Sequence, residues 1–424
     1  MLKKGLVFAV IATIASLNSY AATINSSWIG GTSGDWETAS NWNPAIVPEN
    51  GANTFIVTID GAGGWSLVGL TQNHTITKLY CLGEVDLVSG SWYNMNLTVL
   101  DGLTSNGDVG IDELDITGNV SNDTGGYLKF GEHLNIYGNL YNQSGASIEV
   151  FPHDIDVESG EVYNDGLIIC SGISAIGETP HFHNNGQIQL YGGGANGAIF
   201  DNNSAGMIKG WGTVSGDQLH NKGEICAYGG SLAVGVVGAI LNTGTLKNIP
   251  LSSLHLKAGE DVNNFGTIEV NAGGGVAFDC NLVNEPNGVI NLRGGTLAAT
   301  TLTQKAGATF EGFGTISGNV NIATDGLISL TGPTNVIGDV TVSAGATLRI
   351  SDGQTLITGQ TVNNGAIELV GGTVIFQGGY SGGGTIPVTA GIDRNHFDVN
   401  SDGIEDFKDF AGFAESWLWQ ASWY

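Results

Sequence analysis

The apolar positions of this chain recur with a period near twenty residues, and a glycine marks each repeat. A short phrase, Asn-x-Gly-x-Ile or Leu, carries the period most clearly. It occurs at Asn164–Ile168, Asn184–Ile188, Asn221–Ile225, Asn242–Leu246, Asn264–Ile268 and Asn363–Ile367. Glycines in this phase stand at positions 145, 166, 186, 206, 223, 244, 266, 288, 307, 326, 345 and 365, at intervals of 17 to 22 residues. A period held this long predicts a solenoid with about twenty residues per rung, not a globular domain.

Each repeat predicts one rung of parallel strand in an all-β fold. The apolar residue two places after the glycine opens a short alternating stretch, as in Ile188-Gln189-Leu190. We expect the marking glycine to lie in a turn that needs a positive φ. Repeats at Gly145, Gly307 and Gly345 carry one extra residue before the apolar position, which stays inside only if their turn differs.

Asparagine stands two places before the glycine in six repeats. Stacked on successive rungs, these amides would form a ladder of side-chain to backbone hydrogen bonds inside the turn. The alternative is that asparagine is only a common turn residue. The regular period favours the ladder.

Residues 1–21 have the organisation of a secretory signal peptide. Lys3 and Lys4 precede an apolar run over residues 6–17, and Ser19-Tyr20-Ala21 supplies a small-residue cleavage site. The run is too short to span a bilayer, and no later segment is long and apolar enough. We therefore expect a secreted, extracellular protein without a membrane span, with the cell surface as one destination.

Composition narrows the class of protein and its partners. The chain has 68 glycines among 424 residues and only 12% charged residues, but its 41% hydrophobic content at regular positions predicts a packed core, not disorder. The formal net charge is −27. Such a surface excludes nucleic acid and anionic membranes as partners and favours bound cations, with solubility as the plainer explanation.

Residues 22–100 lack the clean period and are rich in tryptophan. Trp28, Trp36 and Trp42 belong to a W-x-G-G…G-D-W…N-W…P phrase that ends at Pro48. Because a solenoid end exposes an apolar cross-section, we predict that these tryptophans cap the first coils. The alternative is an aromatic platform for stacking sugar rings. The phrase resembles the N-terminal segment of bacterial secreted β-solenoids.

A second phrase, Gly-x-Gly-Thr followed by Ile or Val, recurs in the repeat body, residues 101–390. Copies stand at Gly210–Val214, Gly312–Ile316 and Gly382–Ile386. The phrase resembles the repeats of autotransporter passenger domains and related adhesins. That resemblance implies a right-handed parallel β-helix and a structural or adhesive role.

The chain has four cysteines, and their spacing argues against disulfides. Cys170 and Cys226 are 56 residues apart, close to three rungs. Rungs stack about 4.8 Å apart, so the two Cα atoms would be ~14 Å apart, beyond the ~7 Å that a bridge spans. Cys226 and Cys280 fail similarly. We expect these three to be free, small buried hydrophobes, and leave Cys81 open.

The tail, residues 391–424, has a different composition and a calcium-loop pattern. Oxygen-bearing residues stand at loop positions 1, 3, 5, 9 and 12, with Gly403 at position 6. The expected Ca²⁺ ligands are Asp398, Asn400, Asp402, the backbone carbonyl of Ile404, Asp406 and Asp409. Apolar residues from Phe407 to Leu418 then recur at three- and four-residue spacing, which predicts a short amphipathic helix.

This loop and helix resemble a dockerin type I repeat. The resemblance implies the same calcium ligands and docking to a cohesin-like or cell-surface protein, often within polysaccharide-degrading complexes. The chain departs from that pattern because one loop is visible instead of two. Loop positions 10 and 11 are Phe407 and Lys408, not small hydroxyl residues, and position 8 is Glu405, not an apolar residue. We expect calcium binding to survive these departures better than cohesin binding.

Patterns for catalysis or for a second metal site are weak in the repeat body. Counted from each glycine, no base stacks beside an acid on adjacent rungs, as glycan hydrolysis or elimination requires. His181 and His183 share a face, but His220 falls two rungs from His183, ~10 Å away and too far for one metal ion. We interpret these three as surface histidines, and Asp201 as a solvated loop residue.

We therefore expect a secreted, calcium-binding structural or adhesive β-solenoid that docks through its tail, and no enzymatic activity. The rival hypothesis is a β-helix lyase or glycoside hydrolase, or a carbohydrate-binding component of an extracellular polysaccharide-degrading complex. A cluster of acids and bases on one face of the solenoid would discriminate between them.

Overall fold

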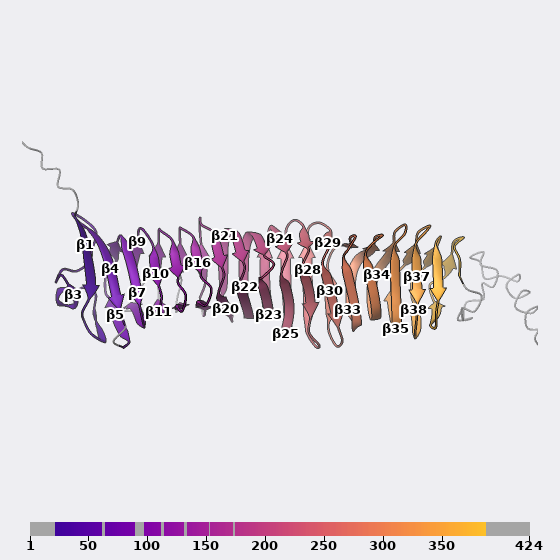
Figure 1. Ribbon diagram of the computed structural model, residues 1–424, viewed down its shortest axis with the longest axis horizontal. Helices are drawn as coiled ribbons and strands as arrows, with labels where there is room; N and C mark the ends of the chain where they lie inside the picture. Colours follow the sequence, from indigo (N-terminus) through magenta and orange to yellow (C-terminus); the bar gives the residue numbers. More distant parts are fainter. Residues whose placement is uncertain are drawn as a thin grey trace, which may run out of the picture.

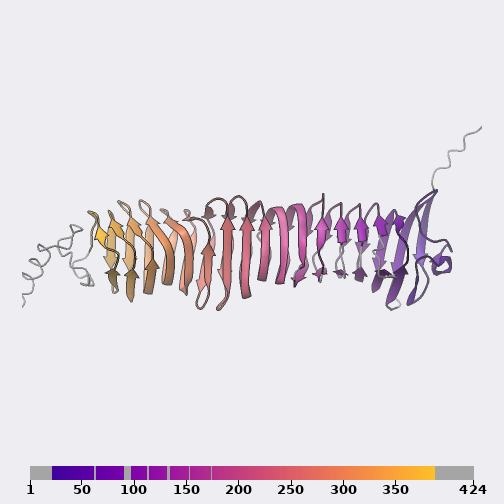
Figure 2. The same cartoon turned by 180° about the vertical axis from the view of Figure 1, so that it is seen from behind.

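The chain folds into a parallel β-solenoid of about 15 turns. The computed structural model describes residues 22–386, except 62–63, 90–96, 112–113, 131–133, 152 and 173. Figures 1 and 2 show the strands lying side by side along one elongated body, with β1 (Thr23–Trp28) at one end and β37 (Thr347–Ile350) near the other. The parallel repeat fold is confirmed, whereas its handedness stays a prediction. The predicted signal peptide and the predicted calcium-loop tail lie outside the described residues.

Each rung has three faces, which we number in chain order. The strands confined to face 1 are β1, β4 (Thr54–Asp60), β7 (Lys78–Leu82), β10 (Leu103–Ser105), β13 (Val120–Asn122), β16 (Leu140–Asn142), β19 (Val162–Asn164), β24 (Gln218–Asn221), β26 (Ile240–Asn242), β29 (Val262–Asn264), β32 (Leu282–Asn284), β36 (Val340–Val342), β39 (Thr361–Asn363) and β42 (Tyr380–Ser381). Those confined to face 2 are β2 (Ser33–Asp35), β5 (Ser66–Leu70), β8 (Val85–Ser89), β11 (Asp108–Ile111), β14 (Tyr127–Phe130), β17 (Ser147–Val150), β20 (Leu167–Ser171), β27 (Thr245–Asn248), β30 (Thr267–Asn271), β37 and β40 (Ala366–Leu369).

Face 3 consists of β6 (His74–Ile76), β9 (Leu97–Val99), β12 (Leu114–Ile116), β15 (Leu134–Ile136), β18 (Ile155–Val157), β28 (Ser253–Ala258), β31 (Gly275–Phe278), β38 (Gln354–Ile357) and β41 (Thr373–Phe376). Seven longer strands bend around a corner and serve more than one face: β21 (Ala175–Asn184), β22 (Gln187–Asn202), β23 (Met207–Gly216), β25 (Glu224–Val236), β33 (Val289–Gln304), β34 (Thr309–Ile322) and β35 (Leu327–Ile337). The N-terminal end adds β3 (Trp42–Asn43) and the short 3-10 helix η1 (Ala39–Asn41).

The core is a column of stacked apolar side chains that alternate with outward polar ones. Strand β19 shows the pattern, with Val162 and Asn164 buried and Tyr163 between them half-buried. Like residues stack on like, as where Phe182 and Phe200 lie ring on ring at 4.6 Å. The period-two pattern after each glycine therefore points the apolar residues into the solenoid.

A ladder of stacked asparagines is confirmed, and it is longer than the sequence phrase. Its main hydrogen bonds join side chain to side chain, whereas we predicted bonds from side chain to backbone. Its members are Asn122, Asn142, Asn164, Asn184, Asn202, Asn221, Asn242, Asn264, Asn284 and Gln304, all buried. Each asparagine amide donates to the side-chain oxygen on the next rung at 2.6–2.9 Å, and Gln304, the last member, donates to the backbone carbonyl of Ala308. Most of the same nitrogens also approach a backbone carbonyl, as Asn142 does at Leu167. The ladder thus satisfies buried amides mainly through one another.

The marking glycines differ from our expectation. Those with the extra residue, Gly145, Gly307 and Gly345, do have positive φ, at 81°, 75° and 79°. The glycines of the Asn-x-Gly phrase do not, so the prediction of a positive φ was wrong for them. They are required because rungs approach closely: a Cβ on Gly186 would lie 2.1 Å from the carbonyl oxygen of Gly166. Any larger residue would push these two rungs apart.

The tryptophan phrase forms a packed end. Trp36 and Trp42 are fully buried and meet edge to face, with ring centroids 4.7 Å apart. Trp28 is 7% exposed and packs on Trp42 in the same way. β3 pairs with β1 in an antiparallel fashion, unlike the parallel rungs that follow. Buried rings cannot stack on sugars, so the alternative of an aromatic platform was wrong for these three residues.

No disulfide joins the cysteines of the described chain, and all four are free. Cys81, Cys170 and Cys226 are buried, whereas Cys280 is only half-buried. Three rungs do separate the level of Cys170 from that of Cys226. The expectation of free thiols is confirmed, but full burial was wrong for Cys280.

Within the part of the chain that the structure describes, no helix has the length and apolar character needed to cross a membrane.

Candidate functional site

Exposed aromatic side chains line one corner of the solenoid, at the end of face 2. We call Phe151, Tyr191, Trp211 and Tyr228 the aromatic column; they are 47%, 45%, 43% and 56% exposed. Tyr191 and Trp211 are paired on adjacent strands. Phe151 directly follows Val150, which pairs with Cys170, and Tyr228 directly follows Ala227, which pairs with Gly210, so both lie at the same rung position. Ser171 fills the remaining rung, next to Tyr191. Sequence reasoning missed this column, although each member directly follows a predicted inner strand.

Glycines on neighbouring rungs lie against two of these rings, those of Trp211 and Phe151. A Cβ on Gly192 would lie 2.9 Å from the Trp211 ring, and one on Gly230 would lie 3.0 Å from the Cβ of Trp211. A Cβ on Gly172 would likewise lie 3.3 Å from the Phe151 ring. These two rings therefore pack on backbone that carries no side chain, which holds them in place along the corner.

The Gly-x-Gly-Thr phrase creates this arrangement. Gly210 and Gly212, which flank Trp211, have φ of 125° and 142°. A Cβ on Gly210 would lie 1.9 Å from the Leu190 carbonyl oxygen. The second copy of the phrase presents Phe313, 43% exposed, beside a hollow of about 240 Å³ whose lining includes Arg293. The phrase thus turns an aromatic residue outward where the chain bends.

Hydrogen-bonding side chains run beside the aromatic column on face 2. Gln189 and Lys209 occupy the same position on adjacent rungs, two residues before Tyr191 and Trp211. The hydroxyl of Tyr191 donates to Oε1 of Gln189 at 2.8 Å. Flat apolar faces flanked by polar donors and acceptors suit a ligand that has both characters.

A second cluster, on the outer side of face 1, contains three histidines and two carboxylates. We call Glu161, His181, His183, Asp201 and His220 the histidine–carboxylate cluster. His183 pairs with Asp201 and Asp201 pairs with His220, so Asp201 lies on the rung between the two histidines. Its carboxylate binds His181 Nε2 through Oδ2 and His220 Nδ1 through Oδ1, both at 2.8 Å. Glu161 Oε2 lies 3.1 Å from His183 Nε2.

These contacts add to the interpretation of the three residues as surface histidines, because the side chains are only partly exposed and are held by carboxylates. The rings of His181 and His183 have centroids 3.7 Å apart, and Tyr163 stacks on His183 at 4.7 Å. His220 does lie two rungs from His183, as predicted, but the prediction overlooked Asp201 on the rung between them. Asp201 is not a solvated loop residue, since its side chain is only 17% exposed.

Hydrogen bonds set the charge of the two carboxylates. Burial alone would raise the pKa of Asp201, but hydrogen bonds from His181 and His220 outweigh it and hold that pKa below its usual value. The Tyr163 hydroxyl donates to Glu161, which lowers the pKa of Glu161 and raises that of Tyr163 to about 12. Both carboxylates are therefore ionised at neutral pH.

Basic side chains do stack beside acids on adjacent rungs, contrary to the sequence prediction. The Lys247 ammonium lies 2.7 Å from Glu224, and Lys305 lies 2.7 Å from Glu285. Counting from the glycines missed Lys247 because it reaches Glu224 diagonally, from the position paired with Cys226. It missed Lys305 because the glycine of that repeat stands one residue closer to the ladder residue than the glycine of the repeat before it. The two pairs lie at different rungs, and in each the lysine ammonium is bound to its own carboxylate. They therefore resemble surface ion pairs more than a catalytic acid and base.

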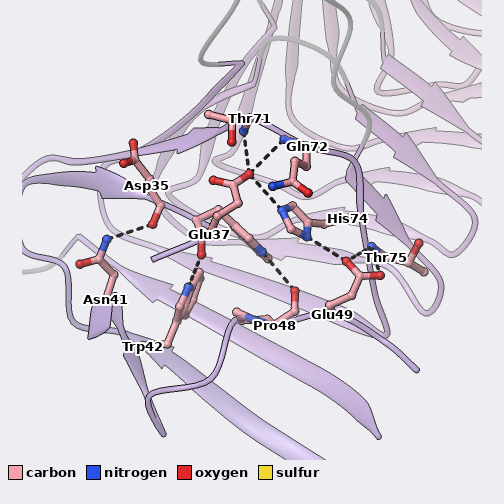
Figure 3. Close-up of polar contacts among 11 residues, drawn as sticks. Asp35, Glu37, Asn41, Trp42, Pro48, Glu49, Thr71, Gln72, His74 and Thr75 are labelled. Atoms are coloured by element: carbon pink, nitrogen blue, oxygen red, sulfur yellow. Dashed lines mark hydrogen bonds and ion pairs between the residues drawn. The ribbon is translucent and has the colours of Figure 1, made fainter. Parts of the chain in front are cut away.

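A third polar group lies inside the N-terminal end (Figure 3). His74, 6% exposed, lies between two carboxylates, with Nδ1 2.8 Å from Glu49 and Nε2 3.1 Å from Glu37. Glu37 also accepts the backbone N–H groups of Thr71 and Gln72 at 2.7 and 3.0 Å. This network ties the strands of the first two rungs together and has the character of a structural lock.

The predicted calcium ligands, from Asp398 to Asp409, lie outside the described residues. No protein-family model, no curated protein and no solved structure matches this chain. Its function is therefore inferred from the geometry of its own surface.

Proposed function

We propose that this chain is a secreted, non-enzymatic β-solenoid that adheres to polysaccharide through its aromatic column and docks through its tail. The aromatic column is the observation that carries the proposal. Apolar rings that are almost half exposed are costly to present to water without a partner, and here several lie together along one corner. Tyrosine and tryptophan are rigid and amphipathic, so they bind with little loss of conformational entropy.

A polysaccharide fits this surface better than a folded protein does. A sugar ring has apolar C–H faces and hydroxyl edges, which match ring faces beside Gln189 and Lys209. The column follows the solenoid axis over several rungs, so an extended chain can contact its members in turn. The second copy of the phrase, at Phe313, places one more aromatic side chain in the same rung position further along the axis.

The termini supply the rest of the proposal. The signal peptide supports secretion, and the tail supports calcium-dependent docking to a cohesin-like or cell-surface protein. In this arrangement the tail anchors the protein and the solenoid extends the aromatic column away from the anchor.

Binding of the full chain to insoluble glycans and to pectin and alginate gels tests the adhesive surface. We expect Trp211→Ala and Tyr228→Ala to weaken binding about tenfold or more, since aromatic anchors dominate such interfaces. Phe265→Ala is the matched control, because Phe265 is 43% exposed but lies at a different corner. Equal retention of all three variants would reject the aromatic column as the adhesive surface.

A polysaccharide-active enzyme is the second candidate, and the histidine–carboxylate cluster is the observation that favours it. A group of acids and bases on one face is the feature that we expected to separate the two hypotheses. The same glycan panel tests the enzyme hypothesis through release of soluble products. Products that form with the natural chain but not with His183→Gln would replace the adhesive proposal with the enzymatic one.

A further inference from the structure

Three side chains of the histidine–carboxylate cluster converge as metal ligands do. The ligand atoms of Glu161, His181 and His183 all lie within 4.8 Å of one another. Tetrahedral zinc bonds of about 2.0–2.2 Å require ligand atoms roughly 3.4 Å apart. The three groups therefore need only small side-chain rotations to close around one ion. The His side chains are 21–25% exposed and Glu161 is 39% exposed, so such rotations have room.

The strand geometry provides this convergence without any loop. His181 and His183 are two residues apart on β21, so both side chains leave the same side of the strand. Glu161 directly precedes β19, the neighbouring strand in register with β21. Phe182, buried between the two histidines, anchors that strand in the core. The backbone positions of all three groups are thus set by the parallel ladder.

Neighbouring residues can orient the ligands as supporting groups do in metalloproteins. Asp201 Oδ2 is 2.8 Å from Nε2 of His181 and 4.0 Å from Nδ1 of His183. His220 holds the other oxygen of Asp201. Histidine ligands are commonly oriented by a carboxylate on the second ring nitrogen, and Asp201 is placed to act in this way or to coordinate directly.

The chemistry of the donors selects the class of ion. Imidazole nitrogens with one carboxylate favour zinc and its neighbours among the divalent transition metals, whereas calcium and magnesium prefer oxygen ligands throughout. Two ionised carboxylates supply negative charge beside the three imidazole rings, and the chain as a whole has a formal net charge of −27. The negative charge of the cluster and that of the whole chain both attract a divalent cation.

We propose that Glu161, His181 and His183 bind one divalent transition-metal ion of the zinc class, with Asp201 and His220 in support. This site is separate from the predicted calcium loop and independent of polysaccharide binding by the aromatic column. It bridges two rungs of face 1, so a bound ion would also link them.

Calorimetric titration of the full, tag-free chain with ZnCl₂ tests the proposal. Calcium is kept in excess so that the tail loop is already filled. We expect one zinc site per chain, and about 100-fold weaker binding in His181→Gln or His183→Gln. Asp201→Asn should weaken binding 10- to 100-fold, as the loss of an orienting group does. His255→Gln, which removes an exposed histidine on β28, should leave the affinity unchanged.

Two further readouts complete the test. Co²⁺ bound in place of zinc should give the visible absorption of a four-coordinate nitrogen–oxygen site, and His183→Gln should abolish it. Affinity should fall from pH 7.5 to about pH 5.5, because protonated imidazole cannot bind a metal. Unchanged zinc stoichiometry and affinity in a folded His181→Gln/His183→Gln double variant would overturn the proposal, as would the absence of zinc binding by the natural chain.

Discussion

Asn264 donates its side-chain amide to Oδ1 of Asn284 at 2.7 Å, while its own Oδ1 accepts the amide of Asn242 at 2.6 Å. All three side chains are fully buried. Each asparagine is therefore the hydrogen-bond partner of the rungs on both sides. Removing Asn264 leaves Oδ1 of Asn284 without its partner and leaves the amide of Asn242 with only a 3.4 Å contact to the Thr267 carbonyl, which together cost more than one hydrogen bond.

Asn264→Ala should therefore lower the free energy of unfolding by about 2–4 kcal/mol. Asn263→Ala is the matched control, because Asn263 lies on the same strand and points outward, half-buried. We expect the control to change the free energy by less than about 0.5 kcal/mol. Urea titration measures both, and similar midpoints for the two variants would contradict the stabilising role of the ladder.

The repeat and its inward face could be predicted from the sequence because they obey a local rule. The Asn-x-Gly-x-Ile phrase fixes which residues are buried, and the structure places Asn164 and Ile168 inside, as expected. The role of the glycines could not be predicted in full. A glycine can be required either by a positive φ or by a close approach of two backbones. At Gly186 the short distance to the neighbouring rung shows that the close approach is the reason.

The histidine–carboxylate cluster was missed for a different reason. Counting from the glycine gave His183 and His220 the same phase, three residues before their glycines, but placed Asp201 five residues before its glycine and so out of line with them. The ladder provides a better reference: His183, Asp201 and His220 each directly precede a ladder asparagine. Aligning the repeats on those asparagines would have placed the three residues in one column. Glu161 could not be found in this way, because its side chain reaches across from another position.

A glycine substitution distinguishes the two structural roles of glycine. Gly312→Ala should destabilise the chain by about 2–3 kcal/mol or more, because Gly312 has a φ of 128° and a Cβ there would lie 1.8 Å from the Leu292 carbonyl oxygen. Gly235→Ala should be neutral or slightly stabilising, since a Cβ there meets nothing within 4 Å. Thermal unfolding of the two variants checks this prediction, and an equal loss in both would contradict it.

Thiol reactivity reports the packing of the core. Burial raises the pKa of Cys81 and Cys170 to about 12, so at pH 8 neither holds a reactive thiolate. In the native chain we expect a thiol reagent to modify the half-buried Cys280 first and to leave Cys81 and Cys170 intact. After denaturation without reductant all four should react, and peptide mapping would reveal any disulfide that contradicts this expectation.

Calcium binding tests the tail through the full chain. Without an ion, the carboxylates at Asp398, Asp402, Asp406 and Asp409 would repel one another, and coordination at about 2.3–2.6 Å relieves that repulsion. We expect a dissociation constant of about 10⁻⁴–10⁻³ M, as in extracellular modules. Asp398→Ala or Asp409→Ala should abolish the calorimetric signal, while Asp393→Ala should retain it. No heat of calcium binding up to ~10 mM would reject both the site and the dockerin-like docking built on it.

Acid should loosen the N-terminal end through Glu37. Burial raises the pKa of Glu37, but hydrogen bonds from the Thr71 backbone and from His74 outweigh it, and the pKa lies below its ordinary value. A carboxylate whose pKa is depressed by folding stabilises the fold above the ordinary value of about 4.3, and this contribution is lost as the pH falls through the lower folded pKa.

Glu37→Gln should therefore destabilise the first rungs by about 1–2 kcal/mol at pH 7, and the difference from the natural chain should shrink below pH 4. Hydrogen exchange of strands β5 and β6, compared between the two chains at each pH, measures the effect. Glu311→Gln, at an exposed position of β34, is the control and should leave exchange in these strands unchanged. A difference that stays constant from pH 7 to pH 3 would contradict this prediction, because it would show that the charge of Glu37 does not contribute to stability.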